Sequence, residues 1–234
     1  CLTALALSKL RPDVPFLLVE GGETFGGNHV WSFFDPDVKV RDRWLVDPLV
    51  MARWDAYDVC FPGRRRTLET PYNSAGSDYL DRTIRHRYPP IRYGLFSPIA
   101  AVGPDHVRLA SGEIIDASGV IDARGPAPTS ALDLGWQKFL GREYRFDRPH
   151  GLRRPIVMDA TVDQEDGYRF VYCLPFSETR MLVEDTYYSL SPTLELATLR
   201  KRIAAYLAAR DWHLAELEGE ETAVLPVVTG GGVE

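Results

Sequence analysis

The sequence predicts an α/β fold in which a Rossmann-like, dinucleotide-binding domain is interleaved with an antiparallel-sheet domain. Two observations carry this prediction. Near the start of the chain, apolar residues at helical spacing over positions 2–10 precede an apolar strand at 16–19 that ends in Glu20, an order typical of a βαβ unit. From residue 156 onward, three apolar and aromatic runs follow one another across short turns, which predicts an antiparallel meander.

Length and composition narrow the class of protein. The chain has 234 residues, of which 45% are hydrophobic and 26% charged, enough for one large domain or two interleaved ones. A net charge of −6 and no basic run longer than the three arginines 64–66 argue against nucleic-acid binding. The three cysteines are far apart and form no CxxC pair, which suits the reducing cytosol and argues against a zinc site or any other metal site.

Apolar runs in the chain are short. None approaches the roughly 20 residues that a membrane-spanning helix needs. We therefore expect a cytoplasmic protein whose contact with a membrane, where it has one, is peripheral.

The first helix and strand indicate where a dinucleotide would lie. Arg11 and Pro12 end the helix, and an acid at the end of the following strand, here Glu20, commonly accepts hydrogen bonds from the ribose of the dinucleotide. The glycine-rich phosphate turn belongs about 20 residues before that acid, which falls before Cys1. The sequence therefore predicts a fragment that lacks this turn. Glu20 alone is weak evidence, because an acid at a strand end is often only solvated.

Two glycine turns are further candidates for close approach to a cofactor. Gly26 and Gly27 form a loop that permits positive φ. Residues 120–124 are predicted to form an apolar strand that runs into a turn at Gly125. That second turn is equally consistent with an ordinary connection.

Alternation and turn signals predict further strands at residues 57–61, 67–72, 107–109, 113–115 and 221–228. The arginines 64–66 are expected in the turn between the first two of these strands. Two more helices are predicted. One is capped by Ser77 and reaches Arg85, and the other begins at Ser191 and Pro192 and reaches about Arg210.

Residues 181–186, Met-Leu-Val-Glu-Asp-Thr, give the clearest functional signal. Side chains alternate along a strand, so Glu184 and Asp185 point to opposite faces and do not form a pair. An acid on an apolar face is desolvated, which raises its pKa and lets it hold a proton near neutral pH. Glu184 is therefore a candidate proton donor. The residues alone leave open the alternative that it pairs structurally with an arginine, which is the more common role of a buried acid.

Several blocks of the chain resemble the bacterial lycopene beta-cyclases, flavoproteins with a glutathione-reductase-like fold. The resemblance extends over nearly the whole chain. Its blocks are Gly-Gly-Asn-His-Val-Trp-Ser-Phe at 26–33, Arg-Trp-Asp-Ala-Tyr-Asp-Val at 53–59, Val-Ile-Asp-Ala-Arg-Gly-Pro at 120–126, Gly-Trp-Gln-Lys-Phe-Leu-Gly at 135–141, Asp-Arg-Pro-His-Gly-Leu at 147–152, Pro-Ile-Val-Met-Asp-Ala-Thr-Val-Asp-Gln at 155–164, Gly-Tyr-Arg-Phe-Val-Tyr at 167–172 and Val-Glu-Asp-Thr-Tyr-Tyr at 183–188.

The resemblance implies an isomerase that closes the linear ψ-ends of lycopene into β-ionone rings, with Glu184 as the catalytic acid. It also implies reduced FAD as cofactor, NADPH as its reductant and a peripheral membrane contact through which lycopene enters. The candidate FAD contacts are Glu20, Gly26, Gly27, Asp122 and Gly125. The aromatic residues Tyr168, Phe170 and Tyr172, or Trp31 and Phe33, are candidate stabilisers of a cation, although each is also an ordinary core residue.

The resemblance implies an incomplete FAD-binding domain made of residues 1–45, 77–128 and 218–234, and a substrate domain made of residues 46–76 and 129–217. Two rival interpretations stay open. One is a flavin-dependent monooxygenase or dehydrogenase of the same fold. The other is an inactive, carotenoid-binding fragment.

Overall fold

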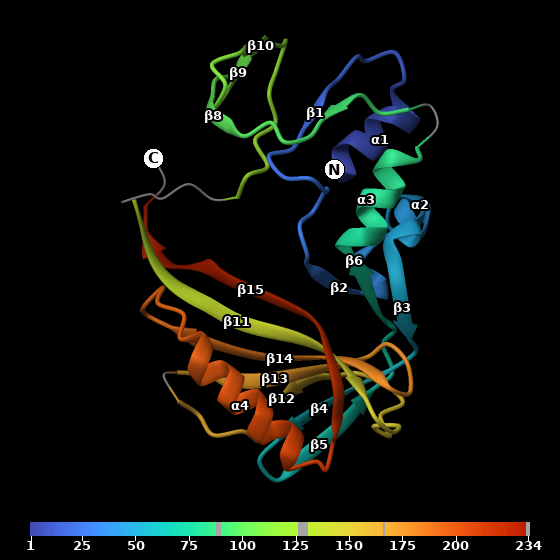
Figure 1. Ribbon diagram of the computed structural model, residues 1–234, viewed down its shortest axis with the longest axis vertical. Helices are drawn as coiled ribbons and strands as arrows, with labels where there is room; N and C mark the ends of the chain where they lie inside the picture. Colours follow the sequence, from blue (N-terminus) through green and yellow to red (C-terminus); the bar gives the residue numbers. More distant parts are fainter. Residues whose placement is uncertain (88–89, 126–130, 166, 233–234) are drawn as a thin grey trace. The chain divides into compact units, whose positions relative to one another are not determined.

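The computed structural model describes residues 1–87, 90–125, 131–165 and 167–232 (Figure 1). The chain divides into two compact units. Unit 1 consists of Cys1–Ala52 and Asn73–Pro126, and unit 2 of Arg53–Tyr72 and Ala127–Glu234. The mixture of helices with parallel and antiparallel strands confirms the predicted α/β class.

Unit 1 holds short elements. Its helices are α1 (Leu2–Leu10), α2 (Arg43–Val46) and α3 (Ser77–Arg85), with 3-10 turns at Asp35–Asp37, Val40–Asp42 and Asp47–Leu49. Its strands are β1 (Leu18–Val19), β2 (Val30–Phe34), β3 (Val50–Trp54), β6 (Tyr72–Gly76), β7 (Tyr93–Gly94), β8 (Ile99–Val102), β9 (His106–Leu109) and β10 (Ile114–Asp116). Strand β3 extends two residues, and β6 one residue, past the division between the units.

Three small sheets organise unit 1. Strand β1 pairs with β7 in parallel, β2, β6 and β3 form a second sheet, and β8, β9 and β10 form an antiparallel meander. The strands predicted at residues 107–109 and 113–115 are confirmed as the antiparallel pair β9 and β10. A core of apolar side chains from α1, α3 and the loops between them, centred on Phe25 and Ile84, holds the unit together.

Unit 2 is built on one seven-stranded sheet. Its elements are β4 (Tyr57–Phe61), β5 (Arg64–Leu68), β11 (Leu132–Phe146), β12 (Ile156–Asp159), β13 (Arg169–Pro175), β14 (Arg180–Ser189), α4 (Leu196–Ala208) and β15 (Leu214–Gly231). The strand order is β15-β11-β14-β13-β12-β4-β5, and only the β12–β4 pair is parallel among the pairs within this sheet. The predicted meander is confirmed as the β12, β13 and β14 strands.

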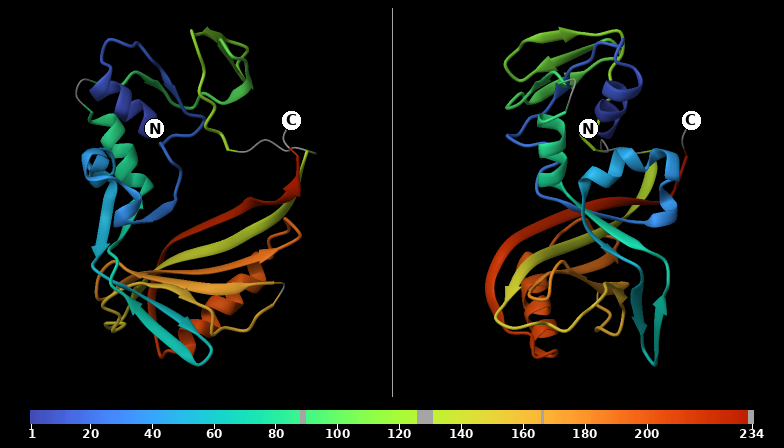
Figure 2. Two further views of the ribbon diagram at one scale, coloured as in Figure 1. Left: turned by 180° about the vertical axis from the view of Figure 1, so that it is seen from behind. Right: turned by 90° about the vertical axis from the view of Figure 1, so that its right-hand side faces the viewer.

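Helix α4 covers one face of this sheet, as Figure 2 shows from behind and from the side. Leu199 and Ile203 of the helix pack against Met181 and Val183 of β14 and against Leu140 of β11, and all five side chains are almost fully buried. Burial of each apolar side chain stabilises the fold by roughly 1.5–3 kcal/mol. This core therefore determines which face of β14 turns toward the helix. The odd-numbered residues of that strand are therefore committed to the interior.

Two helix starts differ from the predictions. Gly76 is the N-cap of α3, so Ser77 is its first residue and not its cap. Helix α4 begins at Leu196 after Glu195, because the hydroxyl of Ser191 is used in a local turn in which it accepts a hydrogen bond from the backbone N–H of Thr193. Such side-chain turns compete with helix initiation.

The three arginines 64–66 lie in strand β5 and not in the turn before it. The turn is limited to Pro62 and Gly63, the latter with φ of +70°. Because β5 is the edge strand, long charged side chains are tolerated there and discourage pairing with other chains. Arg65 also reaches the buried Asp58 at 2.7 Å.

The predicted strand at residues 120–124 does not form. This stretch has no ladder partner, and Ile121 is 73% exposed. Apolar composition alone does not make a strand when no neighbouring strand is available to take up its backbone hydrogen bonds.

Residues 218–232 lie in or just beyond β15, which pairs with β11 along almost its whole length within unit 2. The expected division into an FAD-binding domain of residues 1–45, 77–128 and 218–234 and a substrate domain of residues 46–76 and 129–217 stays a prediction.

Candidate active site

Strand β14 separates two acids onto opposite faces of the sheet, as the alternation predicts. Asp185 shares its face with Met181 and Val183, under α4, while Glu184 shares the other face with Leu182 and Thr186. The two carboxyl groups thus have different surroundings, and their chemistry differs accordingly.

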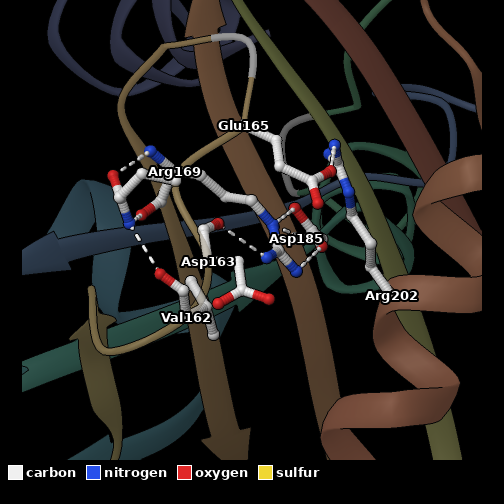
Figure 3. Close-up of polar contacts among 7 residues, drawn as sticks. Val162, Asp163, Glu165, Arg169, Asp185 and Arg202 are labelled. Atoms are coloured by element: carbon white, nitrogen blue, oxygen red, sulfur yellow. Dashed lines mark hydrogen bonds and ion pairs between the residues drawn. The ribbon is translucent and has the colours of Figure 1, made fainter.

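Asp185 is the structural acid of the two. It is fully buried and is held by Arg169, whose Nη2 donates to Oδ2 at 2.6 Å and whose Nε lies 3.0 Å from Oδ1. Figure 3 shows this fork, with Arg169 also donating to the carbonyl oxygen of Asp163 and a second pair, Glu165 and Arg202, beside it. Both oxygens of this carboxylate are therefore engaged by the guanidinium.

Glu184 has no arginine partner among the residues that the structure describes. Its Oε1 accepts a hydrogen bond from the hydroxyl of Thr186 at 2.6 Å, and its side chain is partly buried. The alternative in which this acid is locked to a guanidinium therefore does not hold. The guanidinium belongs to Asp185 instead.

Desolvation is the largest influence on the pKa of Glu184. It raises the pKa of this carboxyl from 4.5 to about 7, with smaller increases from the charges of Glu221 and Asp185, while the hydrogen bond from Thr186 acts in the opposite direction. Close to neutral pH the group is therefore divided between its acid and carboxylate forms. That balance is what general acid–base catalysis requires.

The register places two other residues beside Glu184. Gly141 of β11 lies directly opposite it on one side and Tyr172 of β13 on the other. On the far side of Gly141, Glu221 of β15 is the next residue in the row, and it is 5% exposed. Burial also raises the pKa of the Tyr172 phenol, so this ring stays neutral.

Aromatic rings continue along the same face of the sheet. Phe170 contacts Tyr172 edge-on with ring centroids 5.1 Å apart, and it lies 5.6 Å from Tyr168 and 6.4 Å from Tyr188. Phe170 is 2% exposed, whereas Tyr168 is 42% exposed, so the row leads from the surface of unit 2 towards its interior. The Glu184 carboxyl thus stands beside a run of π faces.

Two to four residues further along the strands, the charges on this face neutralise one another. Arg180 contacts Glu143 at 2.7 Å and Glu218 at 2.6 Å, and Glu218 is also paired with Arg145. These carboxylates are therefore committed to ion pairs, unlike Glu184.

Glu20 lies just after strand β1, which pairs in parallel with β7. Its Oε1 accepts the backbone N–H of Gly22 at 2.9 Å, which shapes the turn that follows the strand. A carboxylate at the carboxyl end of a parallel strand is the acceptor expected for ribose hydroxyls. That role stays a prediction for Glu20.

Gly26 and Gly27 both have positive φ, +84° and +65°. At Gly26 packing adds a second requirement, because a Cβ there would lie 2.7 Å from the ring of Trp31 and 3.0 Å from Leu80. The glycine loop is thus explained in part by its own packing. Contact with a cofactor stays a prediction for both residues.

Gly26→Ala is expected to destabilise the protein by about 1–3 kcal/mol, because it combines left-handed strain with an overlap against a ring. Urea unfolding measures this loss. Gly112→Ala is the matched control, since Gly112 has φ of +93° but open space around it. An equal loss in the two variants would show that backbone strain alone is responsible.

Asp122 and Gly125 lie in the exposed stretch where no strand forms. Arg124 donates to both carboxylate oxygens of Asp122, at 2.8 and 2.7 Å, and this lowers the pKa of the aspartate to about 2. Gly125 has φ of +97° with nothing within 4 Å of an added Cβ. Their role at a cofactor stays a prediction.

The sequence offers one candidate surface for membrane docking, the apolar residues Trp44, Leu45, Val46, Leu49 and Val50. Part of this stretch lies in the interior of unit 1. Leu49 is 5% exposed and belongs to the core, and Leu45 packs against that core. The Nζ of Lys9 lies 3.8 Å above the ring of Trp44. Over the described ranges, no helix has both the length and the apolar character needed to cross a bilayer.

Gly141 and Glu221 were not recognised as site residues from the sequence. Gly141 ends one of the blocks that resemble the lycopene beta-cyclases and Glu221 begins a predicted strand, but no local signal pairs them. Their contact depends on the register of β11 with both β14 and β15, which is set across strands separated by up to 80 residues.

Comparison with known proteins identifies the family. A family model described as "Lycopene cyclase protein" matches residues 1–234. The chain belongs to the lycopene cyclase family. A lycopene beta-cyclase from Pantoea ananas is 42% identical over 234 residues, covering all of this chain and 61% of that protein. One from Pseudescherichia vulneris is 41% identical over 233 residues, covering 60% of its length. The chain thus spans about 60% of the length of these relatives.

Solved structures with little sequence identity to this lycopene cyclase family member share its fold. A peptidyl tryptophan dihydroxylase matches with a TM-score of 0.65 at 18% identity, over 97% of this chain and 54% of the other. A flavin-dependent brominase matches with a TM-score of 0.63 at 12% identity, over 96% of this chain and 65% of the other. At such identities the likeness establishes the fold alone.

Proposed function

We propose that this lycopene cyclase family chain is the larger part of a lycopene beta-cyclase. The full enzyme would convert the ψ-ends of lycopene into β-ionone rings, giving β-carotene by way of γ-carotene. The observation that carries the proposal is Glu184, a carboxyl whose pKa is raised to about 7 by desolvation on a face lined with aromatic rings. Family membership supplies the substrate class.

The reaction needs a proton that is given and then taken back. Protonated Glu184 adds its proton to the terminal double bond, which leaves a tertiary carbocation. The neighbouring double bond attacks that cation and closes the ring, and a proton leaves the ring to form the new alkene. The carboxylate of Glu184 is the base available for this last proton. Atoms and charge balance, so the conversion is an isomerisation.

The surroundings of Glu184 suit a hydrocarbon cation. Water would capture such a cation, so the site must be dry, and the same dryness raises the pKa of the acid. The faces of Phe170 and Tyr172 would stabilise positive charge by roughly 0.5–2 kcal/mol each. Thr186 orients the carboxyl through its 2.6 Å hydrogen bond.

The residues of unit 1 fit FAD. Glu20, at the end of β1, offers a carboxylate for ribose hydroxyls, and Gly26, Gly27 and Gly125 have the positive φ that lets backbone approach a ligand. Asp122 is the further contact in the proposal. Reduced FAD, when bound, would supply electron density that stabilises nearby positive charge, and NADPH is the reductant we propose for it.

Production of pigment tests this proposal. The full-length protein that contains this sequence is expressed in cells that accumulate lycopene, and the carotenoids are separated by chromatography. We expect β-carotene, with γ-carotene as the intermediate. Cells that keep only lycopene would refute the cyclase assignment. Oxygenated products would favour a flavin-dependent monooxygenase of the same fold.

Lycopene resides in lipid bilayers, so we propose that the full enzyme binds peripherally to a membrane. Sedimentation of the protein with lipid vesicles tests this part separately. Binding that depends on vesicles containing lycopene would indicate recognition of the substrate and not of the lipid surface.

A further inference from the structure

The β4–β5 edge of the sheet in unit 2 carries a patch that is both apolar and basic. Its members line a hollow of about 320 Å³ and are Val59, Phe61, Arg64 and Arg66. Arg66 pairs with Val59 in the register, and Arg64 pairs with Phe61. The four side chains therefore lie on one face of the hairpin, and we call them the edge patch. Phe61 is 39% exposed, although it is a large apolar residue.

The positive charge of the edge patch is not neutralised. Within the parts of the chain that the structure describes, Arg64 and Arg66 form no ion pair. Arg65, between them, points to the opposite face and binds the buried Asp58 at 2.7 Å. The chain as a whole has a net charge of −6, so this local positive charge does not follow from composition. A partner that fits the patch combines negative charge with an apolar layer.

The edge patch lies on the aromatic face of the sheet and not on the face that α4 covers. Cys60 of β4 and Asp159 of β12 are neighbours in the register. Asp159 accepts a hydrogen bond from the hydroxyl of Tyr206 in α4 at 2.8 Å, so this pair lies on the helix side. The preceding pair, Val59 and Met158, therefore lies on the aromatic side, because side chains alternate along each strand.

Contacts continue from the edge patch to the acid. The hydroxyl of Tyr168 donates to the sulfur of Met158 at 3.1 Å, and the ring of Tyr168 lies 5.6 Å from that of Phe170. Phe170 contacts Tyr172, which pairs with Glu184. From β5, the last strand of the sheet, to β14 there are four strand spacings (Figure 1), or roughly 20 Å. A long polyene can follow this apolar path while its other end remains in a bilayer.

We propose that the edge patch docks the protein on a bilayer that contains anionic phospholipid. Arg64 and Arg66 bind headgroup phosphates, and Phe61 enters the layer below them. Arginine suits this role because its guanidinium donates two parallel hydrogen bonds to a phosphate, and an apolar body with a charged tip fits an interface. The inference rests on the proposed function, because it names the surface through which a polyene dissolved in the bilayer reaches the acid.

Sedimentation with vesicles tests the edge patch without lycopene and without turnover. The full-length protein is mixed with vesicles of phosphatidylcholine alone, or of phosphatidylcholine with phosphatidylglycerol. We expect binding to the anionic vesicles that weakens as the salt concentration rises. The double variant Arg64→Gln with Arg66→Gln should bind about 10–30-fold more weakly, because each basic residue adds to the attraction by the anionic surface. Phe61→Ser should bind more weakly at every salt concentration, since apolar contact is not screened.

A matched control separates the edge patch from net charge. Arg92→Gln with Arg108→Gln removes two positive charges from exposed positions of unit 1, and this variant should bind vesicles like the parent. Inorganic phosphate separates a bilayer from a soluble anion. It should displace the protein no better than chloride does at the same ionic strength. Stronger displacement by phosphate would identify a site for a soluble anion and overturn the docking assignment.

Turnover separates this inference from the function it rests on. With lycopene in anionic vesicles, Arg64→Gln with Arg66→Gln should need about tenfold more lipid to reach half its maximal rate, with kcat unchanged. In neutral detergent micelles it should match the parent. An inactive parent would contradict the cyclase assignment, while vesicle binding would still test the edge patch. Vesicle binding that is unchanged in this double variant, or that falls equally in the control, would overturn the inference alone.

Discussion

Replacing Glu184 with glutamine is expected to abolish ring closure while making the folded protein more stable above neutral pH. Glutamine keeps the shape of the side chain and can still accept the hydrogen bond from Thr186, but it has no proton of suitable acidity. Loss of a general acid commonly costs about 10²–10⁴-fold in rate. Here the cost should reach the upper end or exceed it, because an alkene is not protonated by water at neutral pH.

The gain in stability follows from the direction of the pKa shift. Folding raises the pKa of Glu184 from 4.5 to about 7, so between these values the folded state binds more protons than the unfolded state. Stability therefore falls as pH rises through this window. The carboxyl favours folding fully below pH 4.5 and has lost that contribution above pH 7.

Glutamine does not titrate, so Glu184→Gln should escape this loss. We compare the free energy of unfolding of the variant with that of the parent at each pH. This difference should shift in favour of the variant by about 2–3 kcal/mol between pH 4 and pH 8. Urea unfolding at the two pH values measures the difference. Glu143→Gln is the control, because its carboxylate lies on the same face but is paired with Arg180.

The two readouts separate a catalytic role from a structural one. If Glu184 only supported the fold, its replacement would lower activity and stability together. Persistence of β-carotene in cells carrying Glu184→Gln would remove this residue from the acid role. Stability that changes equally at pH 4 and pH 8 would show that the carboxyl is better solvated than its surroundings indicate.

The fold was predictable where the signal is local. Alternation along residues 181–186 placed Glu184 and Asp185 on opposite faces, and the short turn between the last two apolar runs predicted the β13–β14 hairpin. The start of α4 and the stretch 120–125 were predicted wrongly. At the start of α4, serine side chains form local hydrogen bonds that compete with helix initiation. At residues 120–125, the apolar sequence has no neighbouring strand to pair with.

The site was predictable only in part, for a related reason. The acidity of Glu184 follows from its own strand, since desolvation by apolar neighbours is implied by the pattern. Its relation to Gly141 and Glu221 depends on how β11 aligns with two strands distant in sequence. The register of β13 with β14 decides which arginine meets Asp185, so the sequence could not show that the buried ion pair belongs to Asp185 and not to Glu184.

Removal of Arg169 is expected to have the largest effect on stability in unit 2. Arg169→Met would leave the carboxylate of Asp185, which is fully buried, without the three hydrogen bonds of 2.6–3.1 Å that it now accepts from the guanidinium. An uncompensated buried charge of this kind costs about 3–5 kcal/mol. Urea unfolding at neutral pH measures the loss.

Two further variants show whether the charge or the packing is responsible. Arg202→Met removes the neighbouring pair with Glu165 (Figure 3), in which the Glu165 side chain is 57% exposed, and it should cost less than Arg169→Met because a pair with one solvated partner contributes little. The double variant Arg169→Met with Asp185→Leu removes both buried charges and should recover most of the stability, since apolar residues often replace a buried pair without loss. If the double variant is no more stable than Arg169→Met, the hydrogen bond that Nη1 of Arg169 donates to the carbonyl oxygen of Asp163 matters more than the charge of the arginine. Because the ion pair and Glu184 lie on opposite faces of β14, recovery of stability should also restore ring closure, which ties the orientation of the acid to the packing behind it.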